Sequence, residues 1–215
     1  FFYNVKGEIC FFTDTEVEII WTASEALRKP WGHFYRLLLL TGQRKSEVAG
    51  LRWEELDCNE CIWAIPANRT KNDKAHIVPL SPPVIAELNE LAAGTIWPKS
   101  GYVLTTNHRT SISGFSKAKR ILDQLIAQSQ NDEALSHWRV HDIRRTVATG
   151  LQRLGVRFEV TEAVLNHVSG AKGGVAGVYQ RHDWKDEKRS ALDSWASHLT
   201  RTQPADNVIK LEPRA

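Results

Sequence analysis

Two neighbouring runs of strand-forming residues stand out in a chain whose other patterns are helical. The runs are Cys61–Ile65 and His76–Leu80, and the polar loop Asn68–Lys74 separates them, which predicts a β-hairpin. Tyr102–Leu104 is a candidate for a further short strand. The sequence therefore predicts an α+β fold that is mostly helical and carries one small antiparallel β-sheet.

The remaining segments carry helix start and stop signals. Thr13 begins the first predicted helix and Pro30 stops it. Gly42 ends the second helix, and Ser46 can cap a short third one. The predicted helices span about Thr13–Arg28, Trp31–Leu40, Ser46–Leu51, Ser81–Leu91, Ser113–Gln128, His141–Leu154, Glu159–Leu165 and Asp183–Leu199.

Length and composition indicate one soluble domain. The 215 residues suit a single domain, and contents of 42% apolar and 25% charged residues exclude a disordered or collagen-like chain. The longest clear apolar run, Leu37–Leu40, is far shorter than the roughly 18 residues of a membrane span. The first residues lack the features of a signal peptide, and the chain has no methionine. We therefore expect a fragment or processed product that is not exported.

The three cysteines, Cys10, Cys58 and Cys61, indicate a reducing compartment rather than a disulfide framework. Cys58 and Cys61 have the spacing of some zinc and redox sites. A structural zinc needs four ligands, however, and neither a second pair nor a histidine at finger spacing completes the set. We expect ordinary cysteines in a turn between strands.

Positive charge gathers in the second half of the chain. The net charge is only +3, but residues 101–185 hold 12 Lys and Arg against 7 Asp and Glu. A basic region of this kind favours nucleic-acid binding, and a solvated surface is the alternative.

The predicted helix that begins at His141 combines a buried stripe with two arginines. At about 100° per residue, Arg144 lies near the edge of the stripe, where packing can hold it still, and Arg145 points away from it. We therefore expect a defined role for Arg144 and a looser phosphate contact for Arg145. The stripe consists of Ile143, Val147, Leu151 and Leu154.

A second arginine lies in a constrained turn earlier in the chain. Arg44 falls between two predicted helices, and the nearby carboxylate of Glu47 can orient it. Guanidinium groups bind phosphate oxygens in a bidentate manner. Arg44 and Arg144, with Lys71 at the hairpin tip and two histidines, are therefore candidates to bind one phosphodiester.

Five separated motifs follow one another along the chain: Thr41–Arg44, Thr70–Lys71, His141–Thr146, Leu165–His167 and Tyr179. In this order they resemble the tyrosine recombinase, or phage integrase, family, especially the integrases of prophages and genomic islands. The resemblance spans roughly Thr13 to Leu199 and implies the family's catalytic-domain fold. The family's usual Leu-Gly-His has Asn166 in place of glycine here, and we expect this departure to matter little.

The resemblance implies covalent chemistry on DNA without a cofactor. Tyr179, which follows the glycine-rich segment Gly170–Gly177, would attack the scissile phosphate and become joined to the DNA 3′ end. Arg44 and Arg144 would hold the non-bridging oxygens, and His167 would add a hydrogen bond. No metal is expected, because these cationic side chains already neutralise the phosphate.

Two further side chains would move protons. His141 would accept the tyrosine proton or assist its transfer, and Lys71 would protonate the leaving oxygen as general acid. Sequence spacing alone leaves the choice between Lys71 and its neighbours Arg69 and Lys74 open, since only the family's Thr-Lys pattern favours Lys71.

Other basic residues are candidates for contacts with the DNA backbone, with a solvated surface as the alternative. They are Lys45, Arg69, Lys74, Arg109, Lys117, Lys119, Arg120 and Arg145.

The resemblance also implies domains and partners. Residues 1–12 would be a linker from an upstream DNA-binding region, 13–199 the catalytic domain, and 200–215 a flexible tail. The partners would be double-stranded DNA attachment sites, further copies of the chain in a DNA-bound tetramer, and accessory DNA-bending or directionality factors, in a bacterial cytoplasm. The apolar face of the last helix, which includes Trp195, would be either core or an interface with a neighbouring protomer.

Two other functions stay open. A catalytically silent DNA-binding module would keep the basic surface without turnover. A metal-dependent hydrolase would use His137, His141, Asp142 and His167, but no glutamate stands where a metalloprotease-type base would be.

Overall fold

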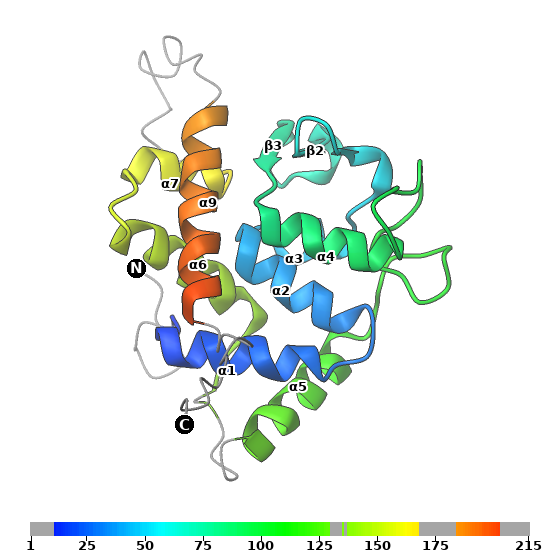
Figure 1. Ribbon diagram of the computed structural model, residues 1–215, viewed down its shortest axis with the longest axis vertical. Coiled ribbons are helices and arrows are strands. Elements are labelled where there is room, and N and C mark those ends of the chain that lie inside the picture. Colours follow the sequence, from blue (N-terminus) through cyan, green and yellow to red (C-terminus); the bar gives the residue numbers. More distant parts are fainter. Residues whose placement is uncertain (1–10, 130–134, 136, 168–183, 203–215) are drawn as a thin grey trace, which may run out of the picture.

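The computed structural model describes residues 11–129, 135, 137–167 and 184–202 (Figure 1). Helices dominate these residues, as the sequence predicts. No helix among them is long and apolar enough to cross a membrane. The α-helices are α1 (Asp14–Glu25), α2 (Trp31–Thr41), α3 (Lys45–Ala49), α4 (Pro82–Ala92), α5 (Phe115–Ser129), α6 (Val140–Arg153), α7 (Phe158–Val164) and α9 (Lys185–Thr202).

The first helix shows how local signals set an element's start and end. The Thr13 hydroxyl accepts a hydrogen bond from the Glu16 backbone, and the Glu16 carboxylate accepts one from the Thr13 backbone, so a reciprocal cap starts α1. The helix ends at Glu25, earlier than the predicted Arg28. The reason is that the Arg28 carbonyl accepts the backbone N–H of Trp31 at 2.9 Å and belongs to the turn that leads into α2.

The core is built around α2. Its apolar run Leu37–Leu40 is buried, and α1, α4, α6 and α9 all pack against this helix (Figure 1). Burying one helix on every side requires an apolar surface all round, which the run of leucines supplies. The leucine run, which is too short to span a membrane, therefore lies at the centre of the domain.

The sheet has three antiparallel strands, one more than the predicted hairpin. They are β1 (Leu56–Asp57), β2 (Ile62–Ile65) and β3 (His76–Pro79), in the order β1-β2-β3. Two short 3₁₀ helices, η1 (Trp53–Glu55) and η2 (Ala67–Arg69), flank them. At two residues, β1 is too short to produce an alternating pattern.

Two predictions about loops have different outcomes. The segment Tyr102–Leu104 is not a strand, since only Tyr102 forms an isolated bridge, with Arg52. Cys58 and Cys61 are free and lie in the turn between β1 and β2, as expected. Among the described residues, no three His, Cys, Asp or Glu side chains gather as a potential metal site.

The last helix belongs to the core of its own chain. The apolar face of α9 is buried against α2, α6, α7 and β3, which resolves the alternative between core and interface in favour of the core. Trp195 is 1% exposed, donates its indole N–H to the Leu39 carbonyl at 2.7 Å, and packs over Gly150 of α6. In α6 the predicted stripe is buried except for Leu154, which is 41% exposed because it forms the cap beyond the last turn.

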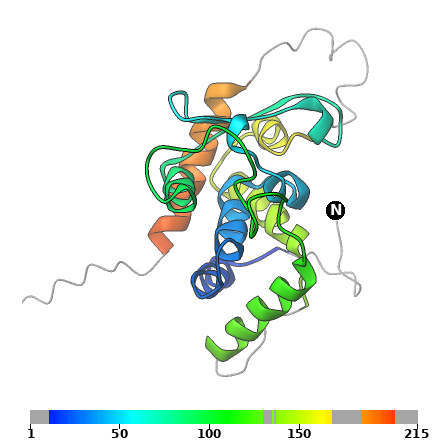
Figure 2. The same ribbon diagram turned by 90° about the vertical axis from the view of Figure 1, so that its right-hand side faces the viewer.

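The sheet and the end of α7 lie at one end of the molecule, and α5 lies at the other (Figure 2). The contact at the sheet end is direct, since the His76 ring of β3 hydrogen-bonds the Val164 carbonyl of α7 at 3.1 Å. The hairpin loop, the turn after α7 and the start of α3 meet in this region.

Candidate active site

Arg44 is held at the start of α3 by a neighbouring carboxylate. Gly42 ends α2 in the left-handed conformation, with φ at +65°, and turns the chain so that Arg44 caps α3. Glu47 is 1% exposed and accepts hydrogen bonds from the Arg44 backbone N–H and from Nη1, both at 2.9 Å. This pairing is the one that the sequence spacing predicts.

Arg144 is buried although it carries a charge. It is 4% exposed on α6, and its guanidinium donates to the Gly42 carbonyl at 2.8 Å and to the Leu165 carbonyl. Packing therefore holds it still, as its place at the edge of the apolar stripe predicts. Arg145 is partly exposed and forms an ion pair with Asp142 at 2.5 Å.

The turn after α7 arranges both arginines. Three consecutive carbonyls point toward other elements: Val164 accepts from the Gln43 amide at 2.9 Å, Leu165 accepts from Arg144, and Asn166 accepts from Arg44 at 3.2 Å. Consecutive Cα atoms lie about 3.8 Å apart. The two guanidinium groups are thus fixed to adjacent peptide units and form one cationic cluster.

Arg44 pairs with Glu47, but Arg144 has no carboxylate partner among the described residues. The hydrogen-bond partners of Arg144 are carbonyls rather than carboxylates, and burial together with the charge of Arg44 lowers the pKa of Arg144 to about 9. The charges of Glu47 and Glu162 oppose that shift. Arg144 is still protonated at neutral pH, so the cluster can bind an anion.

Two histidines lie close to the arginines. The surroundings of His141 desolvate its ring, and the charges of Arg145, Arg144 and His167 add to this effect, so the pKa of His141 lies below its ordinary value. The side chain of His167 is 40% exposed, and its Nδ1 lies 2.9 Å from a carboxylate oxygen of Glu162. His141 is therefore neutral at physiological pH, the form that can accept a proton.

Lys71 in the hairpin loop is exposed, whereas Arg69, another candidate for the general acid, binds other residues of the protein. The guanidinium of Arg69 binds the Glu55 carboxylate and donates to the Glu47 carbonyl at 2.8 Å. Within the part of the chain that the structure describes, neither Lys71 nor Lys74 forms an ion pair. Of the three candidates for the general acid, Lys71 and Lys74 are therefore the two that remain without such a partner in this part of the chain.

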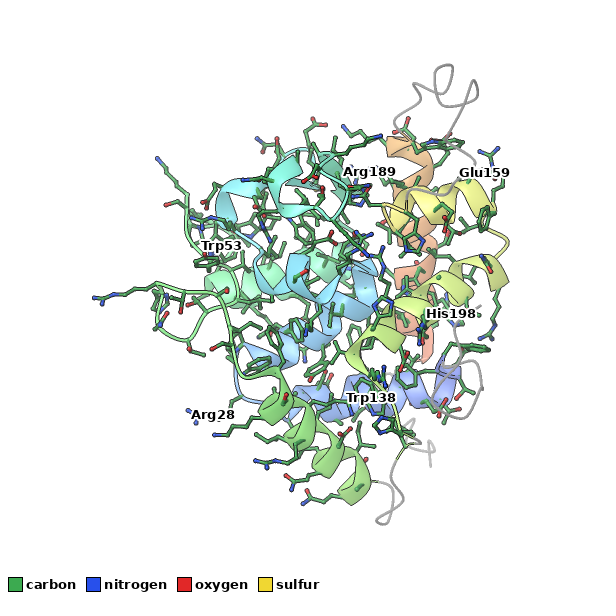
Figure 3. The ribbon with its side chains drawn as sticks, turned by 180° about the vertical axis from the view of Figure 1, so that it is seen from behind. Arg28, Trp53, Trp138, Glu159, Arg189 and His198 are labelled. Carbon is green, nitrogen blue, oxygen red and sulfur yellow. The ribbon has the colours of Figure 1, made fainter. Side chains whose placement is uncertain are left out.

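The other predicted DNA contacts fall into two groups. Lys45 lies 4.8 Å from the centre of the Phe115 ring, and Lys119 lies 3.7 Å from the Trp138 ring and pairs with Asp123. Trp138 lies where α1, α5 and the start of α6 meet (Figure 3). Lys119 thus contributes to packing, whereas Lys45 stays exposed. The exposed residues on and before α5 that stay available are Arg109, Lys117 and Arg120.

Sequence reasoning missed several residues that position the site. The Val164 carbonyl at the end of α7 is bound by Gln43 and His76, and His167 is bound by Glu162. The Asn166 side chain pairs with Asn72. Only Gln43 carried a signal, as part of the Thr41–Arg44 motif. Tyr179 and the glycine-rich lead before it lie outside the described residues.

The metal-hydrolase alternative gains no support. The Asp142 carboxylate is occupied by Arg145 and by the backbone N–H of Arg139. Nothing in the described ranges forms a group of three potential metal ligands that includes His137, His141 or His167.

Comparison with known proteins identifies the family. The model of the phage integrase family matches residues 11–183, most of the chain. The chain belongs to this family. The integrase-family chain is 30% identical over 176 residues to the prophage integrase IntA of Escherichia coli K12, and 27% identical over 167 residues to the integrase of Shigella phage Sf6. These matches cover 80% and 76% of this chain, but 39% and 40% of the two relatives.

Solved structures share the fold of this integrase-family chain. The XerA recombinase matches with a TM-score of 0.58 at 21% identity, covering 90% of this chain and 64% of that one. A λ integrase dimer bound to a COC′ core site matches with a TM-score of 0.53 at 15% identity, covering 82% of this chain and 49% of that one. The fold is thus that of a tyrosine recombinase catalytic domain.

Proposed function

We propose that this chain is the catalytic domain of a site-specific DNA recombinase that integrates or excises a prophage or genomic island in a bacterial cytoplasm. The observation that carries the proposal is the pair of arginines fixed to adjacent peptide units, of which Arg144 is buried and bonded to carbonyls instead of carboxylates. A family whose chemistry acts on a DNA phosphate fits this anion-binding cluster.

Arg44 and Arg144 have donors left for a phosphate. A guanidinium has five N–H donors, and each arginine uses one from Nη1 and one from Nη2 on protein acceptors. The remaining donors would hold the two non-bridging oxygens of the scissile phosphate. Each preorganised donor of this kind stabilises the transition state by about 3 kcal/mol.

The reaction would conserve the phosphodiester energy in a protein–DNA bond. The Tyr179 hydroxyl attacks phosphorus, the bond to the 5′ oxygen breaks, and a 3′-phosphotyrosine forms. The tyrosine proton passes to neutral His141, and Lys71 gives a proton to the leaving 5′ oxygen. His167, oriented by Glu162, donates to the phosphate. Attack by a 5′-hydroxyl from another strand reverses these steps and rejoins the DNA.

The proposed partners follow from the same reaction. Two duplexes must meet for strand exchange, so we propose double-stranded attachment sites and a tetramer of this chain on DNA, with accessory factors that bend DNA or set direction. The matched structures include XerH bound to its difH substrate and a λ integrase dimer on a core site. The linker, catalytic-domain and tail boundaries at residues 12 and 199 belong to this proposal.

A suicide-substrate assay tests the function. A nicked duplex with the attachment core, read from the boundaries of the mobile element that encodes the protein, is incubated in EDTA and examined for a denaturation-resistant protein–DNA adduct. We expect an adduct that Tyr179→Phe abolishes and that Tyr102→Phe, a control whose ring lies against Arg52 instead of Arg44 or Arg144, retains. DNA binding without any adduct would refute the recombinase and support a silent DNA-binding module.

A further inference from the structure

Asn166, where the family pattern has glycine, makes a contact that glycine could not make. Its backbone lies in the left-handed region, with φ at 48°, which asparagine tolerates better than most side chains. Its side chain pairs reciprocally with Asn72: the Asn72 amide donates to Asn166 at 2.9 Å, and the Asn166 amide donates to Asn72 at 3.3 Å. The backbone thus keeps the shape that suits glycine, and the side chain adds a link between two loops.

The Asn72–Asn166 pair connects the arginine that would bind the phosphate to the loop that carries the proposed general acid. The Asn166 carbonyl holds Arg44, and Asn72 directly follows Lys71 in the chain. Arg69, near the start of the hairpin loop, binds Glu55 and the Glu47 carbonyl, and the Thr70 hydroxyl donates to the nearby Ala67 and Lys74 carbonyls. In the described residues, the amide pair is therefore the side-chain contact that connects the tip of this loop to the arginine cluster.

We propose that the Asn72–Asn166 pair is a positioning device that holds the hairpin loop against the arginine cluster, so that Lys71 reaches the leaving 5′ oxygen. The inference rests on the function proposed above. The pair supplies two neutral hydrogen bonds to the loop, so losing both should lower the population of the competent loop about tenfold or more.

The variants separate positioning from folding. Asn166→Gly removes the side chain, keeps the carbonyl that binds Arg44, and adopts positive φ without strain. Asn72→Ala removes the other partner. Asn68→Ala is the matched control, because Asn68 is exposed in the same connection and has no part in the pair. Urea unfolding shows that each variant is folded.

The readout is cleavage of two suicide substrates, one with an ordinary phosphodiester and one with sulfur in place of the leaving 5′ oxygen. A thiolate leaves without a proton, since a thiol has a pKa near 8.5, so general-acid catalysis is not needed for the second substrate. We expect Asn166→Gly and Asn72→Ala to cleave ordinary DNA about tenfold more slowly and the sulfur substrate at the unmodified protein's rate. The double variant should be no slower than either single one.

The variant Lys71→Ala distinguishes failure of the positioning role from failure of the general-acid assignment. Lys71→Ala should also be slow on ordinary DNA and restored on the sulfur substrate. If Lys71→Ala is restored but Asn166→Gly is slow on both substrates, or cleaves ordinary DNA at the full rate, the positioning role is refuted alone. If Lys71→Ala is not restored while the Tyr179 adduct still forms, Lys71 is not the general acid and the inference is refuted with that assignment.

Discussion

Gly150 has room for no side chain because the Trp195 ring lies against it. A Cβ placed on Gly150 would lie 2.3 Å from Cζ3 and 2.7 Å from Cη2 of that ring. The ring has little freedom to move, since Trp195 is 1% exposed and its indole N–H is bonded to the Leu39 carbonyl. At an exposed helix position, Gly→Ala stabilises a protein by about 1 kcal/mol. At Gly150 the overlap should reverse the sign, and we expect Gly150→Ala to lower the free energy of unfolding by about 1–3 kcal/mol.

Urea unfolding of a small set of variants measures this effect. Gln152 is exposed on the same helix, so Gln152→Ala and Gln152→Gly give the propensity difference without a clash. Trp195→Phe removes the part of the ring nearest Gly150, so Gly150→Ala should cost at least about 1 kcal/mol less in that background. Two results would refute the packing of α9 on α6. One is that Gly150→Ala stabilises the protein by as much as Gln152→Ala exceeds Gln152→Gly. The other is that the free energy of unfolding lost through Gly150→Ala is the same with Trp195→Phe as without it.

Two further predictions concern the site and its acid stability. Glu47→Gln removes the charge that holds Arg44, so single-turnover cleavage should slow roughly 10–100-fold, the effect of losing a hydrogen bond to a charged group, and an unchanged rate would contradict the orienting role. Burial, followed by the charge of Lys188, lowers the pKa of His76 to about 3, whereas the unfolded chain takes up this proton near 6.5. The contribution of neutral His76 to the free energy of unfolding is therefore fully present above pH 6.5. It is lost as the pH falls toward 3, and the loss is about 2 kcal/mol at pH 5. Urea midpoints of His76→Gln should fall less between pH 6.5 and 5 than those of the exposed control His137→Gln, and equal slopes would show that His76 does not titrate in this way.

Much of the secondary structure was predictable because its signals are local. The reciprocal cap of Thr13, the stop at Gly42 and the two prolines in the first turn of α4 act on residues within one turn. The elements that sequence reasoning missed or misplaced lack such signals. The two-residue strand β1 forms only because β2 pairs with it, and Tyr102–Leu104 has no strand beside it beyond one bridge.

The residues of the site were predictable as a set, but their arrangement was not. Motif order placed Arg44, Arg144 and His167 in one family pattern, and the spacing of Glu47 predicted its contact with Arg44. The position of Arg69 against Glu55 and Glu47 depends on how the hairpin folds back onto α3. Whether Lys71 rather than Lys74 supplies the proton stays a prediction, as does the role of Tyr179.

The sequence by itself determined the class of fold, the family and the candidate chemistry, because periodicity, caps and motif order are properties of neighbouring residues. Only the tertiary structure decided that α9 is core, that adjacent carbonyls hold both arginines, and that Asn166 binds Asn72. The physical reason is distance along the chain: Asn72 and Asn166 are 94 residues apart and Arg144 and Gly42 are 102 apart. Contacts between such distant residues form only when the whole core packs, and a local pattern carries no record of them.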